Sequence, residues 1–326
     1  MIFPHSGVGF FYLGIMFRLK LSSKTLQANQ PIIATIGNFD GFHLGHQELL
    51  GQLNQLANAQ QAWRMLITFD VLPHEYFADK AGILRSPRIG LLRDKIQIIQ
   101  ASGMIDEVVV LHFNQALAQL TPLEFIQKIL LERLKISDML VGHDFRFGDQ
   151  ARGSIADLRA SGIVTSEFAE LKHQQVRVSS SLIRELAADQ NLAMIQSYLG
   201  HNICYTSRVV KGNQLARKWN FPTINLNLYK IRPVLWGIYT SYVYIDGQRY
   251  FGVTNIGKNP TVSEGKVYKI ETHLLDVDLD LYSKIAAVEI LHFLRPELKF
   301  DGLEPLFKQM YQDLADAREF FAKIKE

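Results

Sequence analysis

The sequence predicts an α/β domain with a doubly wound parallel sheet, followed by a β domain built as an antiparallel six-stranded barrel with a closing helix. Three observations predict this order. The chain has 326 residues, too many for one hydrophobic core. Apolar runs alternate with helical patterns in the first part, whereas from Arg208 onward strand patterns follow one another. We therefore place the domains at residues 21–199 and 200–326.

The composition is that of an ordinary globular protein, with 48% hydrophobic and 21% charged residues. The net charge of +3 is small and the Lys and Arg residues are scattered, so no nucleic-acid partner is predicted. The single cysteine, Cys204, excludes an internal disulfide and fits a cytoplasmic protein; it is expected in a core rather than in catalysis. We expect a monomer or a weak homo-oligomer.

Residues 1–20 stand apart as an extra N-terminal segment. The apolar stretch Val8–Phe17 precedes the first Lys or Arg, the reverse of a signal peptide, and it is too short to span a bilayer. We expect a poorly ordered extension, with a membrane-surface anchor as the alternative. No other segment reaches transmembrane length, so no membrane partner is predicted.

The first element of the α/β domain is the stretch that organises it. The β-branched run Pro31–Ile36 predicts a buried parallel strand, and helical spacing over Leu44–Ala59 predicts a helix, so Gly37–His43 is a strand-to-helix turn. Backbone amides at such a helix start are unpaired and lie at the positive end of the helix dipole. The turn is therefore expected to bind phosphate.

Four residues of this turn carry its chemistry. Gly37 and Gly41 would let the main chain approach a triphosphate closely. His43 and His46 are three residues apart on one helix face, where imidazoles can stabilise charge on a leaving pyrophosphate. Two histidines in a turn can also be surface or core residues, but the strand before and the helix after them favour the catalytic interpretation.

The alternation continues along the chain. Apolar runs predict strands at Met65–Phe69, Glu107–Leu111, Met139–Gly142 and Ile163–Phe168. Helical spacing predicts helices at Ile89–Ser102, Pro122–Lys135, Ser154–Ala160 and Leu192–Tyr198. Thr121 before Pro122, with Glu124 following, is a typical helix start. This alternation predicts a parallel sheet, whose ligands lie beyond the carboxyl ends of the strands.

Two further segments are expected at the edge of the sheet where the carboxyl ends of the parallel strands lie. Val141–Gly148 follows one predicted strand, and Arg177–Arg184 opens a helix after the next. Serines at a helix start can simply be caps. Three serines between two arginines, however, suit a phosphate better than capping alone.

These motifs resemble a known family. Gly37–His46, GNFDGFHLGH, is similar to the nucleotidyltransferase signature of the bacterial bifunctional riboflavin kinase/FAD synthetases, also called FMN adenylyltransferases. Val141–Gly148 and Arg177–Arg184 resemble two further motifs of that family, with Ser181 in place of Thr. Thr68–His74 is only loosely similar to its flavin loop.

The resemblance implies a site for ATP and for FMN. It implies His43 and His46 as catalytic residues and Asp144 and Phe145 as flavin-binding residues. The nucleotide-binding residues that it implies in this half are Gly37, Asn38, Phe39, Asp40, Gly41, Arg177, Ser179, Ser180, Ser181 and Arg184.

The sequence pattern in the second half of the chain predicts a β-barrel. After a basic turn at Lys211–Lys218, strands are predicted at Phe221–Leu228, Gly237–Ile245, Gln248–Ile256, Tyr268–Val277 and Ile285–Phe293. Asp246 and Gly247 form a two-residue hairpin turn, and short hairpin links favour an antiparallel barrel. Leu303–Ile324 is predicted as the closing amphipathic helix.

Thr223, Asn225 and Glu271 are the candidate site residues of the barrel. Thr223 and Asn225 alternate along a strand, so they share a face, and their oxygens suit a hard cation that accompanies phosphates. Glu271 lies on the polar face of its strand, where an isolated glutamate is usually just solvated. Residues 221–225, 237–239, 255–261 and 270–276 resemble, in order, the riboflavin kinase module of the same family.

This second resemblance implies Thr223 and Asn225 as Mg²⁺ and phosphate ligands and Glu271 as the general base for the 5′-hydroxyl of riboflavin. It also implies Gly212 and Arg217 as nucleotide-binding residues. The chain departs from the family pattern at Ala216 and Asn220, where the family has glycines, which predicts a weakened kinase site.

The sequence therefore predicts a bifunctional enzyme. Its C-terminal domain would phosphorylate riboflavin to FMN with ATP and Mg²⁺, and its N-terminal domain would join FMN to AMP to give FAD and pyrophosphate. Two alternatives stay open: an adenylyltransferase with a different phosphate acceptor, and a flavin-binding regulatory protein with one site inactive.

Overall fold

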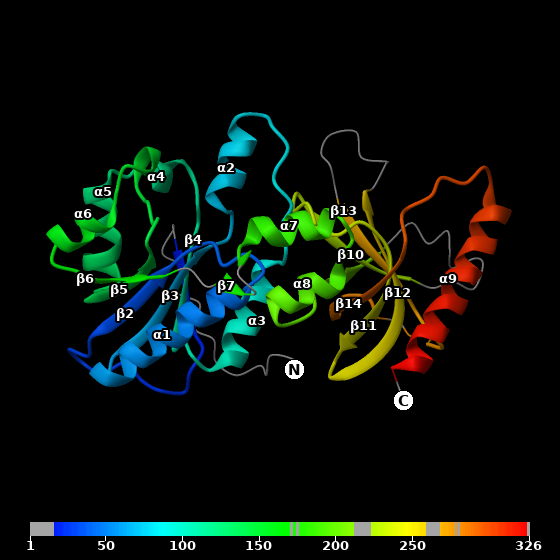
Figure 1. Cartoon of the computed structure of the whole chain (residues 1–326), viewed down its shortest axis with the longest axis horizontal. Helices are drawn as coiled ribbons and strands as arrows, with labels where there is room; N and C mark the ends of the chain where they lie inside the picture. The colour runs from blue at the N-terminus through cyan, green and yellow to red at the C-terminus, as the bar shows by residue number, and fades with distance from the viewer. Residues whose placement is uncertain are drawn as a thin grey trace. The chain divides into compact units, whose positions relative to one another are not determined.

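The computed structural model describes residues 16–169, 172–173, 176–211, 223–258, 268–277, 279 and 281–324. These residues form two compact units (Figure 1). One unit takes residues 16–86 and 95–179 and contains a six-stranded sheet. The other takes residues 87–94 and 180–324 and contains a closed barrel.

The sheet confirms the doubly wound prediction. Its strands are β1 (Met16–Lys20), β2 (Ile32–Ile36), β3 (Trp63–Phe69), β4 (Glu107–Leu111), β5 (Asp138–Gly142) and β6 (Val164–Phe168). Their order is β1-β4-β3-β2-β5-β6, with every pair parallel except β1 and β4. The chain winds outward in both directions from β2 and β5, so the topological switch point, where such sheets bind ligands, lies between these two strands.

Helices cover the sheet and contribute to its core. They are α1 (Leu44–Gln60), α2 (Pro73–Lys80), α3 (Leu92–Ser102), α4 (Gln115–Ala118), α5 (Pro122–Glu124), α6 (Ile155–Ala160), the π-helix η1 (Phe125–Arg133) and the 3₁₀-helix η2 (Asp149–Ala151). Apolar residues of α4, η1 and α6 pack together on the sheet. Strands β2 and β4 are buried at every position, as expected for strands covered on both faces.

The helix start at Thr121 is confirmed. The Thr121 Oγ1 atom accepts a hydrogen bond from the Glu124 amide at 3.2 Å, and the Glu124 carboxylate accepts one from the Thr121 amide at 3.0 Å. The helix that follows differs from the prediction, because after α5 the backbone continues as η1, a π-helix.

The prediction that residues 1–20 form a poorly ordered extension is wrong for Met16–Lys20. These residues form β1, which pairs antiparallel with β4. Met16 and Leu19 are buried, and the Arg18 guanidinium donates to the Glu107 carboxylate at 2.7 Å. The apolar stretch at Val8–Phe17 concealed this short strand, because the strand begins inside it. Residues 1–15 lie outside the described part of the chain.

The barrel confirms the prediction for the second half. Its strands are β9 (Cys204–Val210), β10 (Thr223–Tyr229), β11 (Gly237–Ile245), β12 (Gln248–Lys258), β13 (Tyr268–Leu274) and β14 (Ile285–Arg295). The sheet closes because β9 pairs with both β14 and β10. Asp246 and Gly247 have φ angles of 49° and 83°, as the predicted hairpin turn requires. The helix α9 (Leu303–Lys323), red in Figure 1, follows β14 and packs on β12 and β14.

Segments that precede the barrel in sequence also belong to its unit. They are residues 87–94 and the helices α7 (Ser180–Ala188) and α8 (Leu192–Leu199). The Tyr239 hydroxyl donates to the Gln190 side chain at 2.7 Å, and the Arg184 guanidinium donates to the Pro87 carbonyl at 2.6 Å. The contacts in the structure therefore place the boundary of the barrel unit before Ser180. The change in sequence pattern places the domain boundary after Leu199.

Candidate functional sites

The turn after β2 lies at the switch point of the sheet and has a strained backbone. Phe39 and Phe42 are buried and adopt positive φ angles of 47° and 45°, and Gly41 has a φ of 78°. Left-handed conformations are costly for phenylalanine, so tertiary packing must hold the turn. Gly37 has a different role, because a Cβ atom there would come within 3.3 Å of the Phe39 ring.

The two predicted histidines meet at the start of α1. His43 is the residue that precedes the helix, and His46 lies in its first turn. Their rings stack with centroids 3.7 Å apart and planes 17° apart, and the Phe39 ring lies 5.0 Å from His46. The prediction that both histidines share one helix face is therefore confirmed.

The surroundings of His46 favour a neutral ring. Burial lowers the pKa of His46 well below its ordinary value, and His43 and Lys95 lower it further. Its Nδ1 atom is buried without a hydrogen-bond partner among the described residues. A neutral imidazole has one N–H donor, so His46 can donate a hydrogen bond to a phosphate oxygen but contributes no charge.

Other predicted residues lie near the ends of neighbouring strands. Asp144 follows β5 and forms an exposed ion pair with Arg177 at 3.5 Å. Phe145 stacks on Phe147 with ring centroids 5.4 Å apart and packs on the apolar core of the sheet. Of the turn residues, Asn38 is exposed and Asp40 is buried.

The serine-rich segment is shared between the two compact units. Ser179 belongs to the sheet unit, whereas Ser180, Ser181 and Arg184 begin α7 in the barrel unit. The Arg184 side chain binds the Pro87 carbonyl, so part of this segment has a structural role.

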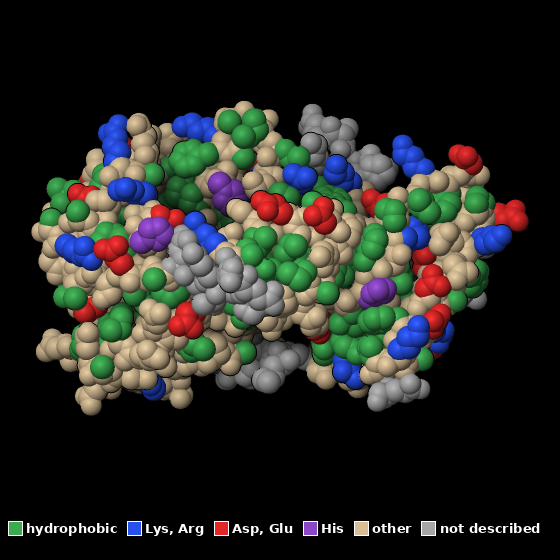
Figure 2. Space-filling model, in the orientation of Figure 1, with side chains coloured by type: hydrophobic (Ala, Val, Ile, Leu, Met, Phe, Trp, Pro, Cys, Tyr) green, Lys and Arg blue, Asp and Glu red, His purple; other side chains and the backbone are tan. Residues whose placement is uncertain are grey.

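An aromatic cluster that the sequence did not predict lies where β3 and β4 end. It consists of Phe69, Tyr76, Phe77 and Phe113, whose ring centroids are between 5.3 and 6.0 Å apart. The Phe77 ring is 50% exposed, and Figure 2 shows hydrophobic side chains on the surface beside α2. Such rings offer stacking surfaces to a flat aromatic ligand. The only signal for them in the sequence was the loose similarity at Thr68–His74.

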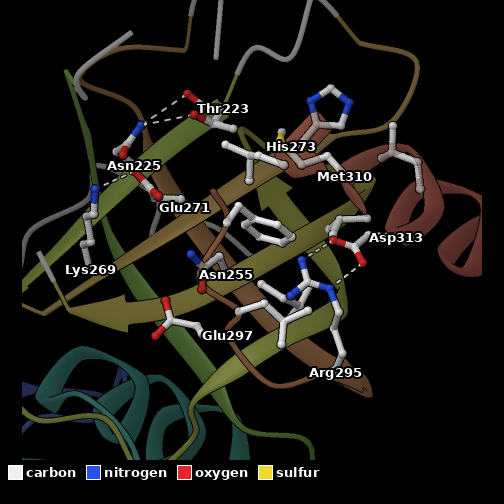
Figure 3. Close-up of a pocket in the computed structure, with 16 residues that line it drawn as sticks. Thr223, Asn225, Asn255, Lys269, Glu271, His273, Arg295, Glu297, Met310 and Asp313 are labelled. Atoms are coloured by element: carbon white, nitrogen blue, oxygen red, sulfur yellow. Dashed lines mark hydrogen bonds and ion pairs between the residues drawn. The ribbon is translucent and has the colours of Figure 1, made fainter. Parts of the chain in front are cut away.

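The second site is a pocket of about 400 Å³ between the outer face of the barrel and α9 (Figure 3). Thr223 and Asn225 reach it from β10 and Glu271 reaches it from β13. Asn225, Glu271 and Asn255 lie directly opposite one another on β10, β13 and β12. The strands thus bring together Thr223, Asn225 and Glu271, as the sequence predicted.

Strand alternation explains why these side chains face the pocket. Ile270, Thr272 and Leu274 are buried, which leaves Lys269, Glu271 and His273 on the opposite face of β13, where all three line the pocket. The Lys269 ammonium donates to the Glu271 carboxylate at 2.7 Å. Lys269 and Asn255 are site residues that sequence reasoning missed.

The opposite wall of the pocket is apolar and is fixed by an ion pair. Leu306, Met310 and Leu314 of α9 supply apolar side chains. The Arg295 guanidinium binds the buried Asp313 carboxylate through two hydrogen bonds of 2.7 Å, which hold α9 to the end of β14. The pocket therefore has a polar end with oxygen and amide groups and an apolar end.

The polar end fits a Mg²⁺ ion that arrives with phosphates. The Asn225 amide donates weakly to Thr223 Oγ1 at 3.5 Å, so its own oxygen can serve as a ligand beside the threonine hydroxyl. No cluster of three or more His, Cys, Asp or Glu residues is found in the part of the chain that the structure describes. Two neutral oxygens leave most positions of the ion to phosphate and water, as Mg²⁺ prefers.

Several predicted residues cannot be placed. Gly212, Arg217, Ala216 and Asn220 lie outside the described residues, as do parts of the motifs at 221–225 and 255–261. None of the described helices is long and apolar enough to cross a membrane.

A doubly wound α/β domain with a strained turn at its switch point is followed by a closed barrel domain with a pocket beside α9, and the family matches show that this two-domain protein is a transferase. Residues 25–182 match the protein family described as FAD synthetase, and residues 199–321 match the family described as riboflavin kinase. The chain belongs to the family of bifunctional riboflavin kinase/FMN adenylyltransferases.

Relatives of that name match over nearly the whole chain. The *Escherichia coli* (strain K12) protein is 37% identical over 302 residues, which cover 90% of this chain and 94% of the relative. The *Haemophilus influenzae* protein is 34% identical over 297 residues, which cover 90% and 95%. A solved structure titled as a macrolide-efflux protein from *Streptococcus pneumoniae* has a TM-score of 0.70 and 24% identity, with 92% and 97% covered, and shares the fold.

Proposed function

We propose that this chain makes FAD from riboflavin in two ATP-dependent steps. The barrel domain, residues 200–326, phosphorylates riboflavin to FMN, and the α/β domain, residues 21–199, transfers AMP from ATP to FMN and releases pyrophosphate. The observation that carries the proposal is the register of β10, β13 and β12. It places the Glu271 carboxylate opposite the side chains of Asn225 and Asn255, at the polar end of the pocket.

In the kinase step the 5′-hydroxyl of riboflavin must lose a proton as it attacks the γ-phosphorus of ATP, and ADP leaves as the bond from that phosphorus to the bridging oxygen breaks. Glu271 accepts that proton, and the Lys269 ammonium lies 2.7 Å from its carboxylate. Thr223 and Asn225 hold Mg²⁺, which when bound neutralises phosphate charge. The isoalloxazine ring lies in the apolar end of the pocket against α9.

In the adenylylation step the FMN phosphate is already a nucleophile, so no base is needed. The turn binds ATP through backbone groups of Gly37–Gly41, and the nucleotide is held further by Arg177 and Ser179 of the same unit. His43 and His46 donate to the phosphates as pyrophosphate leaves. The flavin lies beside Asp144 and Phe145 against the aromatic cluster.

The proposal extends to partners and location. The ligands are riboflavin, FMN, FAD, ATP and Mg²⁺, with no nucleic acid and no membrane. On the face in Figure 2 basic and acidic side chains are interspersed, unlike the basic patch of a nucleic-acid binder. We place the protein in the cytoplasm as a monomer or a weak homo-oligomer.

A chromatographic assay tests the proposal. The purified chain is incubated with ATP and Mg²⁺, first with riboflavin and then with FMN or other phosphate esters, and the products are separated. We expect FMN and FAD from riboflavin, FAD and pyrophosphate from FMN, and neither reaction after chelation of Mg²⁺. Adenylylation of another ester in preference to FMN would indicate a different acceptor, and flavin binding without turnover would indicate a regulatory protein.

A further inference from the structure

Lys95 connects three elements beneath the nucleotide turn. It lies in α3 and its side chain is buried. Its ammonium donates to the Asn38 carbonyl at 2.6 Å and to the Thr68 hydroxyl at 2.7 Å. One side chain thus joins α3 to the turn that follows β2 and to the end of β3.

The position of this contact matters for the shape of the turn. Asn38 directly precedes Phe39, which has a positive φ of 47°. The carbonyl that accepts the hydrogen bond from Lys95 is part of the peptide bond between Asn38 and the strained residue Phe39. Strained conformations persist only where the surroundings over-determine them, and a hydrogen bond from a charged donor is among the stronger restraints.

Lys95 also acts on the catalytic histidine through its charge. Its ammonium is one of the groups that lower the pKa of His46, after burial and His43. The Lys95 amine group is therefore close enough to act on the ring at the start of α1 as well as on the turn before it.

We propose that Lys95 is a positioning residue for FMN adenylylation, which fixes the nucleotide turn through its hydrogen bond to the Asn38 carbonyl. This inference rests on the proposed function of the turn. Lys95 has a different role from the histidines, because its ammonium donates to the Asn38 carbonyl and the Thr68 hydroxyl. Lys95 determines whether the backbone amides of the turn and the rings of His43 and His46 already have the orientation that ATP requires before it binds.

Three variants test the role of Lys95. Lys95→Met removes the charge and the donors at similar length, Lys95→Arg keeps the charge, and Lys128→Met removes an exposed lysine as a control. With Lys95→Met we expect FAD formation from FMN to fall by about ten- to a hundredfold, the scale of a lost charge-assisted hydrogen bond, and the KM for ATP to rise. Lys95→Arg should restore part of the rate, and FMN formation from riboflavin should not change in any variant.

A second readout does not depend on turnover. NMR titration of the His46 ring should give a higher pKa in Lys95→Met than in the parent chain, and no change in Lys128→Met. If folded Lys95→Met forms FAD at the parent rate, or if its His46 titration is unchanged, the inference is wrong. If the parent chain makes no FAD at all, the proposed function fails, while the titration still decides the role of Lys95.

Thr68→Val covers the case in which Lys95→Met does not fold. It removes one acceptor of the ammonium and also the 3.3 Å hydrogen bond that the Thr68 hydroxyl donates to the Asn38 carbonyl, while Lys95 stays in place. We expect a smaller loss of FAD formation than in Lys95→Met, about two- to tenfold, because the ammonium keeps the Asn38 carbonyl as an acceptor. A parent-like rate in Thr68→Val together with an unfolded Lys95→Met would make Lys95 a stability residue and overturn the proposal.

Discussion

His46 and Glu271 have opposite electrostatic surroundings, and these suit opposite tasks. His46 stacks against His43 and its pKa is lowered by burial, which suits a neutral hydrogen-bond donor. The Glu271 side chain is 30% exposed and accepts a hydrogen bond from the Lys269 ammonium, which suits a carboxylate that meets a substrate hydroxyl. Replacing each residue should therefore affect one reaction and leave the other intact.

His46→Ala should slow FAD formation from FMN about a hundredfold or more, the cost of losing one donor to a transition state. FMN formation from riboflavin should stay at the parent rate. Separate assays of FMN formation and FAD formation measure the two rates. His201→Ala serves as the control, because it removes an imidazole from the other unit. A loss of both activities, or of neither, would remove His46 from the adenylylation site.

Glu271→Gln keeps the shape of the side chain but cannot accept a proton. FMN formation should drop by roughly two to four orders of magnitude, while conversion of FMN to FAD continues. The exposed Glu319 provides a matched control as Glu319→Gln. If Glu271→Gln phosphorylates riboflavin as fast as the parent chain, Glu271 is only a structural residue.

At the scale of elements, the start of α3 is tied to the barrel by one buried carboxyl group. Asp94 accepts hydrogen bonds from the Leu91 amide at 3.0 Å and from the Thr206 amide of β9 at 2.8 Å. Burial raises its pKa from 3.8 to about 7, although the hydrogen bonds oppose this rise. The folded state therefore favours protonated Asp94 more strongly than the unfolded state does.

This difference predicts a pH-dependent stability. Between about pH 4 and pH 7 the folded state binds more protons than the unfolded state, so the free energy of unfolding should fall as pH rises and level off above pH 7. At about 1.4 kcal/mol per pH unit the fall is at most about 4 kcal/mol. Urea unfolding at several pH values should show a flatter dependence for Asp94→Asn, and an equally steep one for Asp316→Asn. A parental slope in Asp94→Asn would show that Asp94 is ionised in the folded state throughout.

Elements with an unambiguous local pattern were predicted, and those defined by distant contacts were not. Strand Glu107–Leu111 has the predicted limits, because the apolar run Val108–Leu111 directly follows Glu107 and all five positions are buried. Strand β1 was missed because only its pairing with β4 distinguishes it from the apolar residues before it. Helix α2 was not predicted from the sequence, because Pro73 is typical of a turn. Proline, however, also suits the first position of a helix.

The same distinction applies to the sites. Thr223, Asn225 and Glu271 could be predicted to share a pocket because strand alternation fixes the side of each residue, and the register then aligns them. Lys95 could not be predicted, because its partners Asn38 and Thr68 lie far away in sequence. The aromatic cluster likewise draws its rings from β3, α2 and the segment after β4.

At the scale of the whole molecule, the two compact units are not two consecutive halves of the chain. Within the described residues the chain passes between units after residues 86, 94 and 179. Ile195, Tyr198 and Leu199 of α8 are buried, and Gln190 binds the barrel residue Tyr239. A cut at the predicted domain boundary would thus remove helices that pack with the barrel.

Two C-terminal fragments test this division. A fragment of residues 180–326 should be more stable than one of residues 200–326 by about 3 kcal/mol or more, since burial of one large apolar side chain contributes about 1.5–3 kcal/mol. Thermal and urea unfolding of both fragments measure the difference. Equal stability would support a boundary at 199/200 and would give α7 and α8 no part in the barrel fold.

Strand β1 has a consequence for how the protein can be handled. It occupies the outer side of β4, whose five residues are all buried. A recombinant chain shortened to begin at residue 21 would leave β4, four of whose five residues are apolar, as an uncovered edge strand that can recruit strands from other molecules. Such a chain would keep every proposed site residue, yet it would be prone to aggregate, and a soluble preparation should start no later than Met16.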